Sequence, residues 1–530
     1  MDTSHAGARH GTIPRMVQDS AGRWPEAVAV VDGASLSYAE LAEQARAVTG
    51  GLLAAGIEPG DRVALWAPNG APWIVAALGI QGTGAWLVPL NTRFKGSEAA
   101  HILGRTRAAA LLVADGFLPA VSAEAVRAVD PDLPALRQVI AIPASGAATT
   151  ADWEALLAAG RANLEAADRR IAAGDGEDTS DVIFTSGTTG EPKGVLLRHA
   201  ASLRAYEAFN TAYGSGPGDR HLITTPFFHC FGYKAGWMLA LLTGATTVPL
   251  ATFDADRALA LIAQHRITHV PGAPTVFSSL LRHPARADHD LSSLRVAIVA
   301  AATISPKLIE DLDRELGLET IMSGYGLTEN HAIGTFTRPG DPLEAVSGSV
   351  GAPAPGVEVR IVGVDGRDLP TGEDGEVLLG GFAHMTGYYE DPRATAEVLR
   401  DGWLATGDVG HLDGHGRLHL TDRKKDIFIV GGFNVAPAEV ESALARIPGV
   451  AQVSVVGVPD DRLGEVAMAF VVPEAGSDLT AERVVEHARA TMANYKVPRR
   501  VRLVGELPVN ATGKVLRHVL RDLGAAEVAS

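Results

Sequence analysis

The sequence predicts an α/β protein: a large N-terminal domain of two β/α subdomains plus a small β unit, followed by a small α+β domain. The chain has 530 residues, which is too long for a single hydrophobic core. Short apolar runs alternate with longer amphipathic ones over most of it, as in parallel sheets covered by helices. From Gly348 onward valines alternate with polar residues, which is typical of antiparallel strands. We place the domain boundary in the charged stretch Asp422–Lys425, which gives domains of residues 1–423 and 424–530.

The first β/α subdomain follows a polar segment, residues 1–12, that we expect to be loose. Ser37 and Glu40 have the spacing of a capping box, and apolar residues recur on one helical face from there to Leu52. Pro59, Gly60 and Asp61 predict a turn. We expect strands at Val28–Val31, Val63–Trp66 and Trp86–Leu90 and a helix at Trp73–Leu78, with the alternation continuing through Ser97–Ile102, Ala109–Val113 and Leu136–Ile142.

Residues 144–180 are rich in alanine, glycine and charge, and we interpret them as a connector that contains a helix. A second Pro-Gly-Asp turn, Pro217–Asp219, suggests a similar β/α half after it, but the shared tripeptide is too short to establish a repeat. We expect helices here at His199–Phe209, Tyr233–Leu242, Ala258–Gln264, Val276–Leu281 and Pro306–Leu316, and strands at Leu222–Thr225, Thr246–Pro249, His269–Val270, Val296–Val299 and Thr320–Met322.

The remaining elements form the small β unit and the C-terminal domain. The predicted β unit has strands at Val357–Val362 and Gly375–Leu379 and a hairpin at Val409–Leu420. For the C-terminal domain we expect helices at Ala438–Ala445 and Ala481–Met492 and strands at Val453–Val458, Met468–Val472 and Arg500–Leu503.

The segment Asp181–His199 places a loop of hydroxyls and glycines between two apolar runs, which predicts a hairpin or a strand–loop–strand unit. Glycines let the main chain approach an anion, and amides, hydroxyls and a lysine can donate hydrogen bonds to a polyphosphate. The loop is not a Walker A motif, because Pro192 stands where the second glycine belongs. The residues expected to bind phosphate are Thr185, Ser186, Gly187, Thr188, Thr189, Gly190 and Lys193.

The string Thr-Ser-Gly-Thr-Thr-Gly-Glu-Pro-Lys-Gly in this segment resembles the phosphate loop of the acyl-adenylate-forming enzymes. That family includes acyl-CoA ligases, firefly luciferase and the adenylation domains of peptide synthetases. The resemblance extends over nearly the whole chain, with the family's main motifs in order. It implies that the protein uses ATP, Mg²⁺ and coenzyme A, and that its small C-terminal domain is mobile.

A second motif runs from Tyr325 to Glu329, after a predicted strand. A carboxylate beside a hydroxyl can hold Mg²⁺ near the phosphates of a nucleotide, although a strand end and turn would look the same. By resemblance, Thr328 and Glu329 contact phosphate and metal, and Tyr325 stacks on adenine. The resemblance also places Ala301, Gly324 and Gly326 at the nucleotide.

Asp408 precedes the predicted hairpin and Arg423 follows it. A carboxylate can accept hydrogen bonds from both ribose hydroxyls, and an arginine adds donors. By resemblance these two residues bind ribose, and Lys425 is the hinge of the small domain. The alternative for Arg423–Lys425 is a solvated cluster of charges.

Two further motifs lie in the C-terminal domain. Gly431, Gly432 and Phe433 resemble the segment that lines the pantetheine tunnel, where a thin thiol arm passes close to the backbone. Lys514, on a glycine turn, matches the adenylation lysine that bridges the carboxylate and the α-phosphate. Taken alone, these segments could be a plain glycine turn and a surface lysine.

His229 lies in the aromatic run Phe227–Tyr233, and by resemblance it stands at the carboxylate, although a histidine among aromatics is often a core residue. Cys230 lacks any sign of a base and an orienting group, so we do not expect a nucleophile there. His411, His415 and His419 recur every four residues, but nearby glycines exclude a helix, and a zinc site is not expected.

Composition excludes several classes of function. The net charge of −16 argues against broad nucleic-acid binding, and 46% hydrophobic residues argue against a disordered chain. A single cysteine cannot form an intramolecular disulfide, and no run of 18 apolar residues could span a membrane. We therefore expect a cytoplasmic protein. The family resemblance implies a small-molecule carboxylic acid as substrate, and a homodimer stays open.

Two stretches, Phe227–Gly236 and Pro271–Arg286, resemble one branch of the family, the bacterial ligases that activate the ring-containing propanoate left from steroid breakdown. The resemblance predicts an AMP-forming acyl-CoA ligase for a bulky, apolar, polycyclic acid of steroid or terpenoid origin. A medium- or long-chain fatty acid is the alternative substrate.

The run Ala300–Ala302 departs from the family pattern, which usually has glycine in place of Ala300, near the nucleotide and the acyl group. An added methyl group there could crowd the site. One alternative is therefore a ligase with weak adenylation that thioesterifies a supplied acyl-adenylate. Another is an idle nucleotide-binding protein, against which the joint presence of Lys193, Glu329, Asp408 and Lys514 argues.

Overall fold

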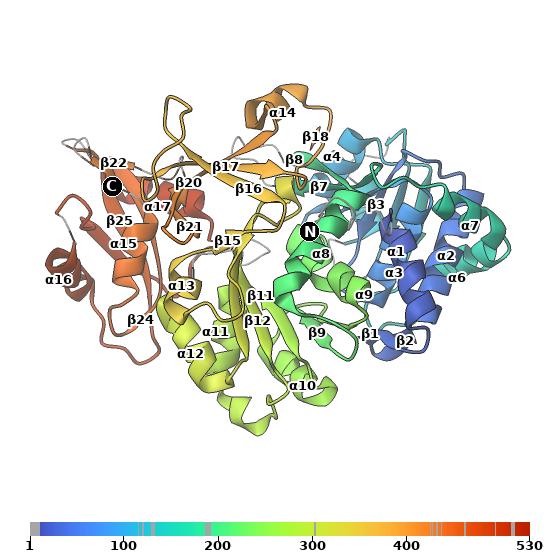
Figure 1. Ribbon diagram of the computed structural model, residues 1–530, viewed down its shortest axis with the longest axis horizontal. Helices are drawn as coiled ribbons and strands as arrows, with labels where there is room; N and C mark the ends of the chain where they lie inside the picture. Colours follow the sequence, from blue (N-terminus) through green and yellow to red (C-terminus); the bar gives the residue numbers. More distant parts are fainter. Residues whose placement is uncertain are drawn as a thin grey trace.

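The computed structural model describes residues 11–114, 116–118, 121–128, 133–185, 192–300, 304–423, 426, 428–430, 433–435, 437–460, 463–492, 494–509 and 515–529. Within these ranges four β-sheets organise the chain. Two large sheets with helices form most of the N-terminal domain, a small antiparallel sheet adjoins them, and a fourth sheet lies in the C-terminal domain, at the opposite end of the molecule from the first (Figure 1). The predicted α/β class is confirmed.

The first large sheet has seven strands in the order β18-β8-β7-β4-β3-β5-β6. Strands β7, β4, β3, β5 and β6 are parallel, whereas β8 is antiparallel to β7 and β18 to β8. Its strands are β3 (Arg62–Trp66), β4 (Trp86–Pro89), β5 (Ala110–Val113), β6 (Gln138–Ala141), β7 (Thr179–Thr185), β8 (Lys193–Arg198) and β18 (Gly387–Tyr388). The helices of this part are α1 (Ile13–Arg23), α2 (Tyr38–Ala54), α3 (Ala71–Gly82), α4 (Gly96–Thr106), α5 (Ala123–Arg127), α6 (Ala151–Arg161) and α7 (Leu164–Ala172).

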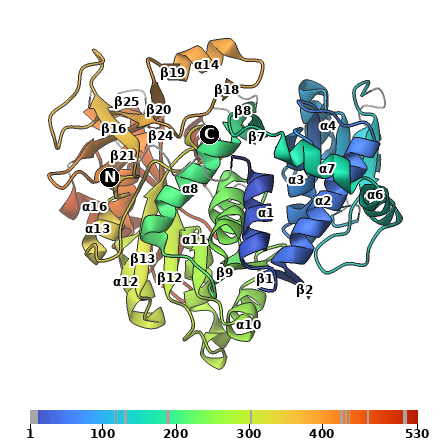
Figure 2. The same cartoon turned by 45° about the vertical axis from the view of Figure 1, so that its right-hand side comes forward.

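The second large sheet has nine strands in the order β15-β14-β13-β12-β11-β9-β10-β1-β2, and its six central strands are parallel. Its strands are β1 (Val28–Asp32), β2 (Ala34–Ser37), β9 (Arg220–Ile223), β10 (Thr246–Pro249), β11 (His269–Gly272), β12 (Val296–Ala300), β13 (Thr320–Tyr325), β14 (Thr335–Phe336) and β15 (Ala352–Pro353). Its helical segments are α8 (His199–Tyr213), η1 (Phe231–Met238), α9 (Leu239–Thr243), α10 (Ala255–His265), α11 (Pro274–Arg282), η2 (Pro284–Asp288), α12 (Pro306–Leu316), η3 (Thr328–Asn330) and α13 (Leu343–Gly348). In Figure 2, α8 lies between the blue helices of the first part and the yellow-green strands of the second.

The two sheets share one apolar core around α3 and η1. Every residue of Trp73–Gly82 is buried, so α3 has no solvent-facing side. The ring of Trp73 packs against Phe227, Tyr233 and Trp237, with centroids 5.4, 5.8 and 5.9 Å away. Offset and edge-to-face aromatic contacts of this kind add to the stability of a core.

The two Pro-Gly-Asp turns mark an internal repeat, which the structure makes much longer than the shared turn. Arg62 pairs with Trp86 in β3–β4, and Arg220 pairs with Thr246 in β9–β10, so the two parallel pairs have the same register. In each half a Thr-Gly-Ala turn enters the second strand, which ends in Val-Pro-Leu at residues 88–90 and 248–250. The hypothesis of two similar β/α halves is confirmed.

Asn69 links the two halves of the repeat. Counted from the Pro-Gly-Asp turn of each half, Asn69 stands at the same position as Phe227. Its buried amide nitrogen donates to the carbonyls of Thr225 and Leu250 at 2.9 and 3.1 Å. The Phe227 N–H donates to its amide oxygen at 2.7 Å. One side chain therefore satisfies three buried backbone groups and fixes the loop that follows β9.

The small antiparallel sheet and the C-terminal sheet complete the fold. The first contains β16 (Val357–Val362), β17 (Gly375–Gly381), β19 (Leu399–Arg400), β20 (Trp403–Leu412) and β21 (Leu418–Arg423), with α14 (Pro392–Val398) beside it. The C-terminal α+β domain contains β22 (Phe428–Val430), β23 (Phe433–Val435), β24 (Val450–Asp460), β25 (Gly464–Pro473) and β26 (Arg500–Leu503), with α15 (Pro437–Leu444), α16 (Ala481–Thr491) and α17 (Arg517–Ala529).

Three predicted elements differ from the structure. The hairpin predicted at Val409–Leu420 is longer, because Asp408 and Arg423 pair with one another inside β20 and β21. The connector at residues 144–180 contains two helices, α6 and α7, and Asn163 lies between them with non-helical backbone angles. The helix predicted at Tyr233–Leu242 begins as the π-helix η1, in which Gly236 departs from helical geometry at ψ −106°. Single π-turns inside helices are frequent at functional sites.

Four histidines are buried: His199, His221, His269 and His331. Their burial predicts that the folded protein loses stability in acid. Burial is the largest cause in each case: it lowers the pKa of His199 to about 3 and the pKa values of the other three well below 6.5. The unfolded chain therefore binds protons that the folded chain does not, and the free energy of unfolding falls as the pH drops from about 6.5 toward 3.

Each of these histidines contributes at most ~1.4 kcal/mol per pH unit in that window. We expect the thermal midpoint to fall by several degrees between pH 7 and pH 5, and His221→Gln to make this dependence shallower. The exposed His415 provides the control, since His415→Gln should leave the slope unchanged. A midpoint that does not move between pH 7 and pH 5 would contradict this account.

Candidate active site

Several candidate site residues lie at or after the carboxyl ends of parallel strands in the second sheet. Gly272 of β11 pairs with Val299 of β12, and Ala300 pairs with Gly324 of β13, so these three strands end side by side. The loop that carries His229 leaves the same edge after β9. Ligands of open α/β sheets bind at this edge, because the loops there are free to vary.

The phosphate segment is a hairpin, as predicted. Strands β7 and β8 are antiparallel, and Thr185 pairs with Lys193 at the mouth of the loop. The Thr185 hydroxyl donates to the carbonyl of Lys193 at 3.4 Å, which closes the base of the loop. Ser186, Gly187, Thr188, Thr189 and Gly190 lie outside the described residues.

Tyr388 connects the lysine of this hairpin to the carboxylate of the second motif. The Nζ of Lys193 lies 4.9 Å from the centroid of the Tyr388 ring. The Tyr388 hydroxyl donates to Oε1 of Glu329 at 2.8 Å. Burial, followed by the Glu329 charge, raises the pKa of the Tyr388 phenol well above its ordinary value, so the phenol keeps its proton near neutral pH. The motif analysis missed Tyr388, whose only signal is its place in Gly-Tyr-Tyr, residues 387–389.

Tyr325 and Asp408 form a second polar pair across this edge. The Tyr325 hydroxyl donates to Oδ2 of Asp408 at 2.6 Å, a short distance that is typical of a charged acceptor. Asp408 is buried in β20 and pairs with Arg423 of β21, so the two residues expected at the ribose share one register position. The arrangement places an aromatic face beside a carboxylate.

The glycines of this region have different reasons to be glycine. A Cβ on Gly326 would lie 2.3 Å from the carbonyl carbon of Ala332, so packing of the chain itself requires glycine. A Cβ on Gly324 would lie no closer than 3.5 Å to the atoms around it. Packing within the protein therefore does not require glycine at position 324, whereas a ligand that lay close to this backbone would require it.

His229 is half-buried and is held by its own loop. Its N–H donates to the carbonyl of Pro226 at 3.1 Å, and its Nδ1 accepts from the N–H of Phe231 at 3.2 Å. The adjacent Cys230 is buried, and burial raises the pKa of its thiol to about 12, with smaller effects from Lys234, Asp181 and Glu329. A thiol with this pKa is not a nucleophile near neutral pH.

A buried charge network underlies the site, and sequence analysis missed it. Lys234 of η1 contacts Asp181 of β7 at 3.0 Å, and both side chains are fully buried. Lys234 also donates to the Ser202 hydroxyl at 2.6 Å, and Ser202 lies 2.9 Å from Nδ1 of His331. The available signal was a single lysine inside the long apolar run of residues 230–242.

Five further predicted site residues lie outside the described ranges: Ala301, Lys425, Gly431, Gly432 and Lys514. Arg423 and Phe433 are described as strand positions, in β21 and β23. Thr328 is buried at the start of η3, directly before Glu329.

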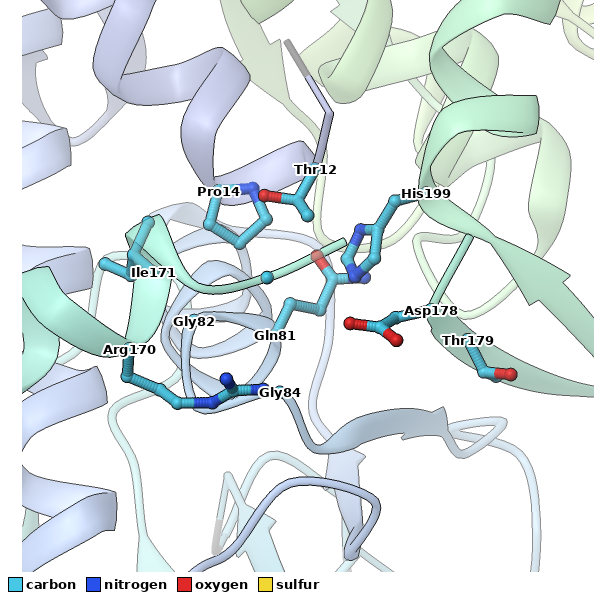
Figure 3. Close-up of a pocket in the computed structure, with 11 residues that line it drawn as sticks. Thr12, Pro14, Gln81, Gly82, Gly84, Arg170, Ile171, Asp178, Thr179 and His199 are labelled. Atoms are coloured by element: carbon cyan, nitrogen blue, oxygen red, sulfur yellow. The ribbon is translucent and has the colours of Figure 1, made fainter. Parts of the chain in front are cut away.

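The cavity in Figure 3 is a different feature. It has a volume of about 10 Å³, room for one water molecule, and is lined by Thr12, Gln81, Arg170, Asp178 and His199 among others. It lies at the start of β7, whereas the loop of the phosphate hairpin follows the end of that strand. Seven residues of extended chain span about 20 Å, so the two places are well separated.

The residues present fit a magnesium ion that arrives with a nucleotide. Thr328 and Glu329 offer the hard oxygen donors that Mg²⁺ prefers. Among the residues that the structure describes, no group of three or more His, Cys, Asp or Glu side chains could hold a metal. A metal at Glu329 would therefore complete its shell with phosphate oxygens and water, as Mg²⁺ commonly does. Within the same ranges, no helix is long and apolar enough to cross a membrane.

Comparisons with known proteins identify the family. Residues 17–389 match the family of AMP-binding enzymes, and residues 439–514 match the AMP-binding enzyme C-terminal domain. A methyl-dioxo-octahydro-indenyl propanoyl:CoA ligase of Mycobacterium tuberculosis is 45% identical, over 97% of this chain and 99% of its own. A ligase of the same name from Rhodococcus jostii is 44% identical, over 96% and 98%.

A solved structure shows the same fold. The anthranilate CoA ligase AuaEII in complex with anthranoyl-AMP superposes with a TM-score of 0.90, at 27% identity and with all of both chains covered. The family match, the full-length relatives and the fold all point to the same reaction class. The chain therefore belongs to the AMP-binding, adenylate-forming enzymes, and among them it is an acid–thiol ligase, an AMP-forming acyl-CoA synthetase.

Proposed function

We propose that the protein converts a propanoate carried on a fused, largely apolar ring system to its CoA thioester. The observation that carries this substrate class is the 45% identity, over 97% of the chain, to the Mycobacterium tuberculosis ligase of a methyl-dioxo-octahydro-indenyl propanoate. The aromatic and glycine-rich run Phe227–Gly236, which contains His229, is a second feature that supports a bulky, apolar acid.

In the first half-reaction a carboxylate oxygen of the acid attacks the α-phosphorus of ATP, and pyrophosphate leaves. Tyr325 and Asp408 hold the adenosine end, while the hairpin amides and Lys193 hold the phosphates, so the α-phosphorus faces the acid. Mg²⁺ bound at Thr328 and Glu329 would neutralise part of the triphosphate charge. His229 borders the carboxylate, and Lys514 supplies a positive charge between carboxylate and α-phosphate.

In the second half-reaction the CoA thiol attacks the acyl carbon, the thioester forms and AMP leaves. We propose that the chain divides at residues 423 and 424, and that the C-terminal domain turns about Lys425 between the two steps. The glycines at 431 and 432 then allow the pantetheine arm to pass close to the backbone.

A panel of acids tests the substrate class. With ATP and CoA, we expect faster thioester formation from a fused-ring propanoate than from ferulate, octanoate or palmitate. The reason is that a site suited to a compact fused-ring propanoate, like the one in the name of the 45% identical relative, would leave part of a long chain unburied. The rates of pyrophosphate release and thioester formation are measured for each acid, and faster turnover of palmitate than of every alicyclic acid would overturn the assignment.

Lys514→Ala tests the proposed point charge. We expect it to lower pyrophosphate release by at least ~100-fold, because removing one preorganised donor to developing charge typically costs that much. Thioester formation from premade acyl-adenylate should be largely unchanged, since the α-phosphate has already reacted. An equal loss in both assays would refute the role of Lys514.

The variant Ala300→Gly distinguishes the proposed function from that of a ligase with weak adenylation. Weak adenylation would follow if the methyl group of Ala300 crowded the site. Ala300 continues β12 in regular register with Gly324, so we expect the site to accommodate the methyl group and the variant to gain less than about twofold. A tenfold gain in pyrophosphate release, with unchanged thioesterification of premade adenylate, would correspond to about 1.4 kcal/mol of relieved crowding and would favour the weak-adenylation alternative.

A further inference from the structure

The segment Met385–Tyr389 lies between the phosphate hairpin and the loop that carries Glu329. On one side it pairs with β8 in antiparallel fashion, because the Thr386 N–H donates to the Leu196 carbonyl at 2.9 Å and the Tyr389 N–H to the Gly194 carbonyl at 2.7 Å. On the other side the Met385 N–H donates to the carbonyl of Glu329 at 2.7 Å. Figures 1 and 2 show β18 beside β8 and β7. A short strand therefore joins two parts of the site that are far apart in sequence.

Tyr388 is the side chain of this strand that reaches both charged groups. Its hydroxyl donates to Oε1 of Glu329 at 2.8 Å, and Lys193 Nζ lies 4.9 Å from its ring centroid. The ring is 8% exposed, so its position is determined by packing. Its backbone is fixed as well, because the Tyr388 N–H donates to the Thr395 hydroxyl at 2.9 Å.

This arrangement gives each charged group a contact with a different part of Tyr388. A lysine and a glutamate at the same site would otherwise attract one another and form an ion pair, which would occupy the groups that a triphosphate and its metal need. No ion pair between Lys193 and Glu329 is found among the described residues, where each contacts Tyr388 instead. The phenol orients one carboxylate oxygen, and the ring face attracts the ammonium group.

We propose that Tyr388 is a positioning residue of the first half-reaction, which orients the Glu329 carboxylate with its hydroxyl and holds the Lys193 ammonium over its ring. The proposal rests on the proposed function, because both groups act there on the triphosphate. Groups that hydrogen-bond to a metal ligand orient it, and losing one typically lowers metal affinity or activity by ~10–100-fold.

The next residue along the strand, Tyr389, provides a matched control. It is 5% exposed, its ring meets Trp86 edge to face at 6.3 Å, and its hydroxyl donates to the Thr106 carbonyl at 3.4 Å. Tyr389→Phe and Tyr388→Phe remove the same atom from neighbouring buried rings. Only the second removal changes a contact to Glu329.

The first experiment measures ATP binding by calorimetry in the absence of an acid, so that no turnover occurs. Tyr388→Phe should bind metal-free ATP within about twofold of the unmodified protein, because the ring beside Lys193 remains. Mg²⁺ should strengthen ATP binding to both proteins. The Mg²⁺ concentration that gives half of this effect should be about tenfold higher for Tyr388→Phe than for the unmodified protein. Tyr389→Phe should match the unmodified protein in both measurements, and circular dichroism and the thermal midpoint verify that both variants are folded.

The second experiment measures the half-reactions. Tyr388→Phe should lower pyrophosphate release about tenfold, with the loss partly restored by excess Mg²⁺. It should leave thioester formation from premade adenylate unchanged. In a double-mutant cycle, Tyr388→Phe should cause little further loss in a Glu329→Gln background, because the oriented charge is already gone. Additive losses in that cycle would contradict the proposal.

The outcomes separate this inference from the function on which it rests. If the unmodified protein forms adenylate but Tyr388→Phe behaves like Tyr389→Phe in its Mg²⁺ dependence, the role of Tyr388 is refuted and the ligase activity stands. If the unmodified protein binds no ATP in the presence of Mg²⁺, both the proposed function and the role of Tyr388 are overturned.

Discussion

The ion pair between Asp181 and Lys234 is the constraint around which the site is arranged. Both side chains are fully buried, and the lysine continues through Ser202 to His331. Removing one partner of a buried pair typically costs ~3–5 kcal/mol, although a buried pair adds little stability compared with apolar residues of the same size. The main effect of the Asp181–Lys234 pair is to fix the position of η1 relative to β7. Asp181 lies in the first strand of the phosphate hairpin, Lys234 follows His229, and His331 follows Glu329, so the network connects three segments of the site.

Sequence reasoning identified the local features of the fold well. The hairpin closed by Thr185 and Lys193 was predictable because two apolar runs flank a breaker-rich loop, and the capping box of Ser37 and Glu40 has a fixed spacing. Helix α12 and strands β10, β16 and β26 have the predicted bounds. In each case the signal and the structure lie in the same short stretch of chain.

The contacts that build the site could not be predicted in this way. Tyr325 and Asp408 were both expected at the nucleotide, but their hydrogen bond joins residues 83 positions apart, which no local pattern encodes. Sequence analysis predicts an ordinary helix where η1 is a π-helix, because apolar periodicity does not distinguish helix types. The burial of Lys234 is a tertiary effect, which a local pattern does not show. Tyr388 was missed because its role depends on a strand pairing with β8 across the chain. Residues such as Lys514 and Lys425, outside the described ranges, remain predictions from resemblance.

The fully buried helix α3 has a consequence for how the protein is made in the cell. The aromatic partners of its Trp73, namely Phe227, Tyr233 and Trp237, belong to the second half of the repeat and are synthesised much later. A ribosome adds ~5–20 residues per second, so on the order of ten seconds pass between translation of the two. During that interval α2 and the strands of the first sheet can already cover most of α3, whereas the face that carries Trp73 has no partner yet. The first β/α half therefore completes its core only after residue 237 has been synthesised, and a fragment that stops before residue 227 leaves the Trp73 face exposed.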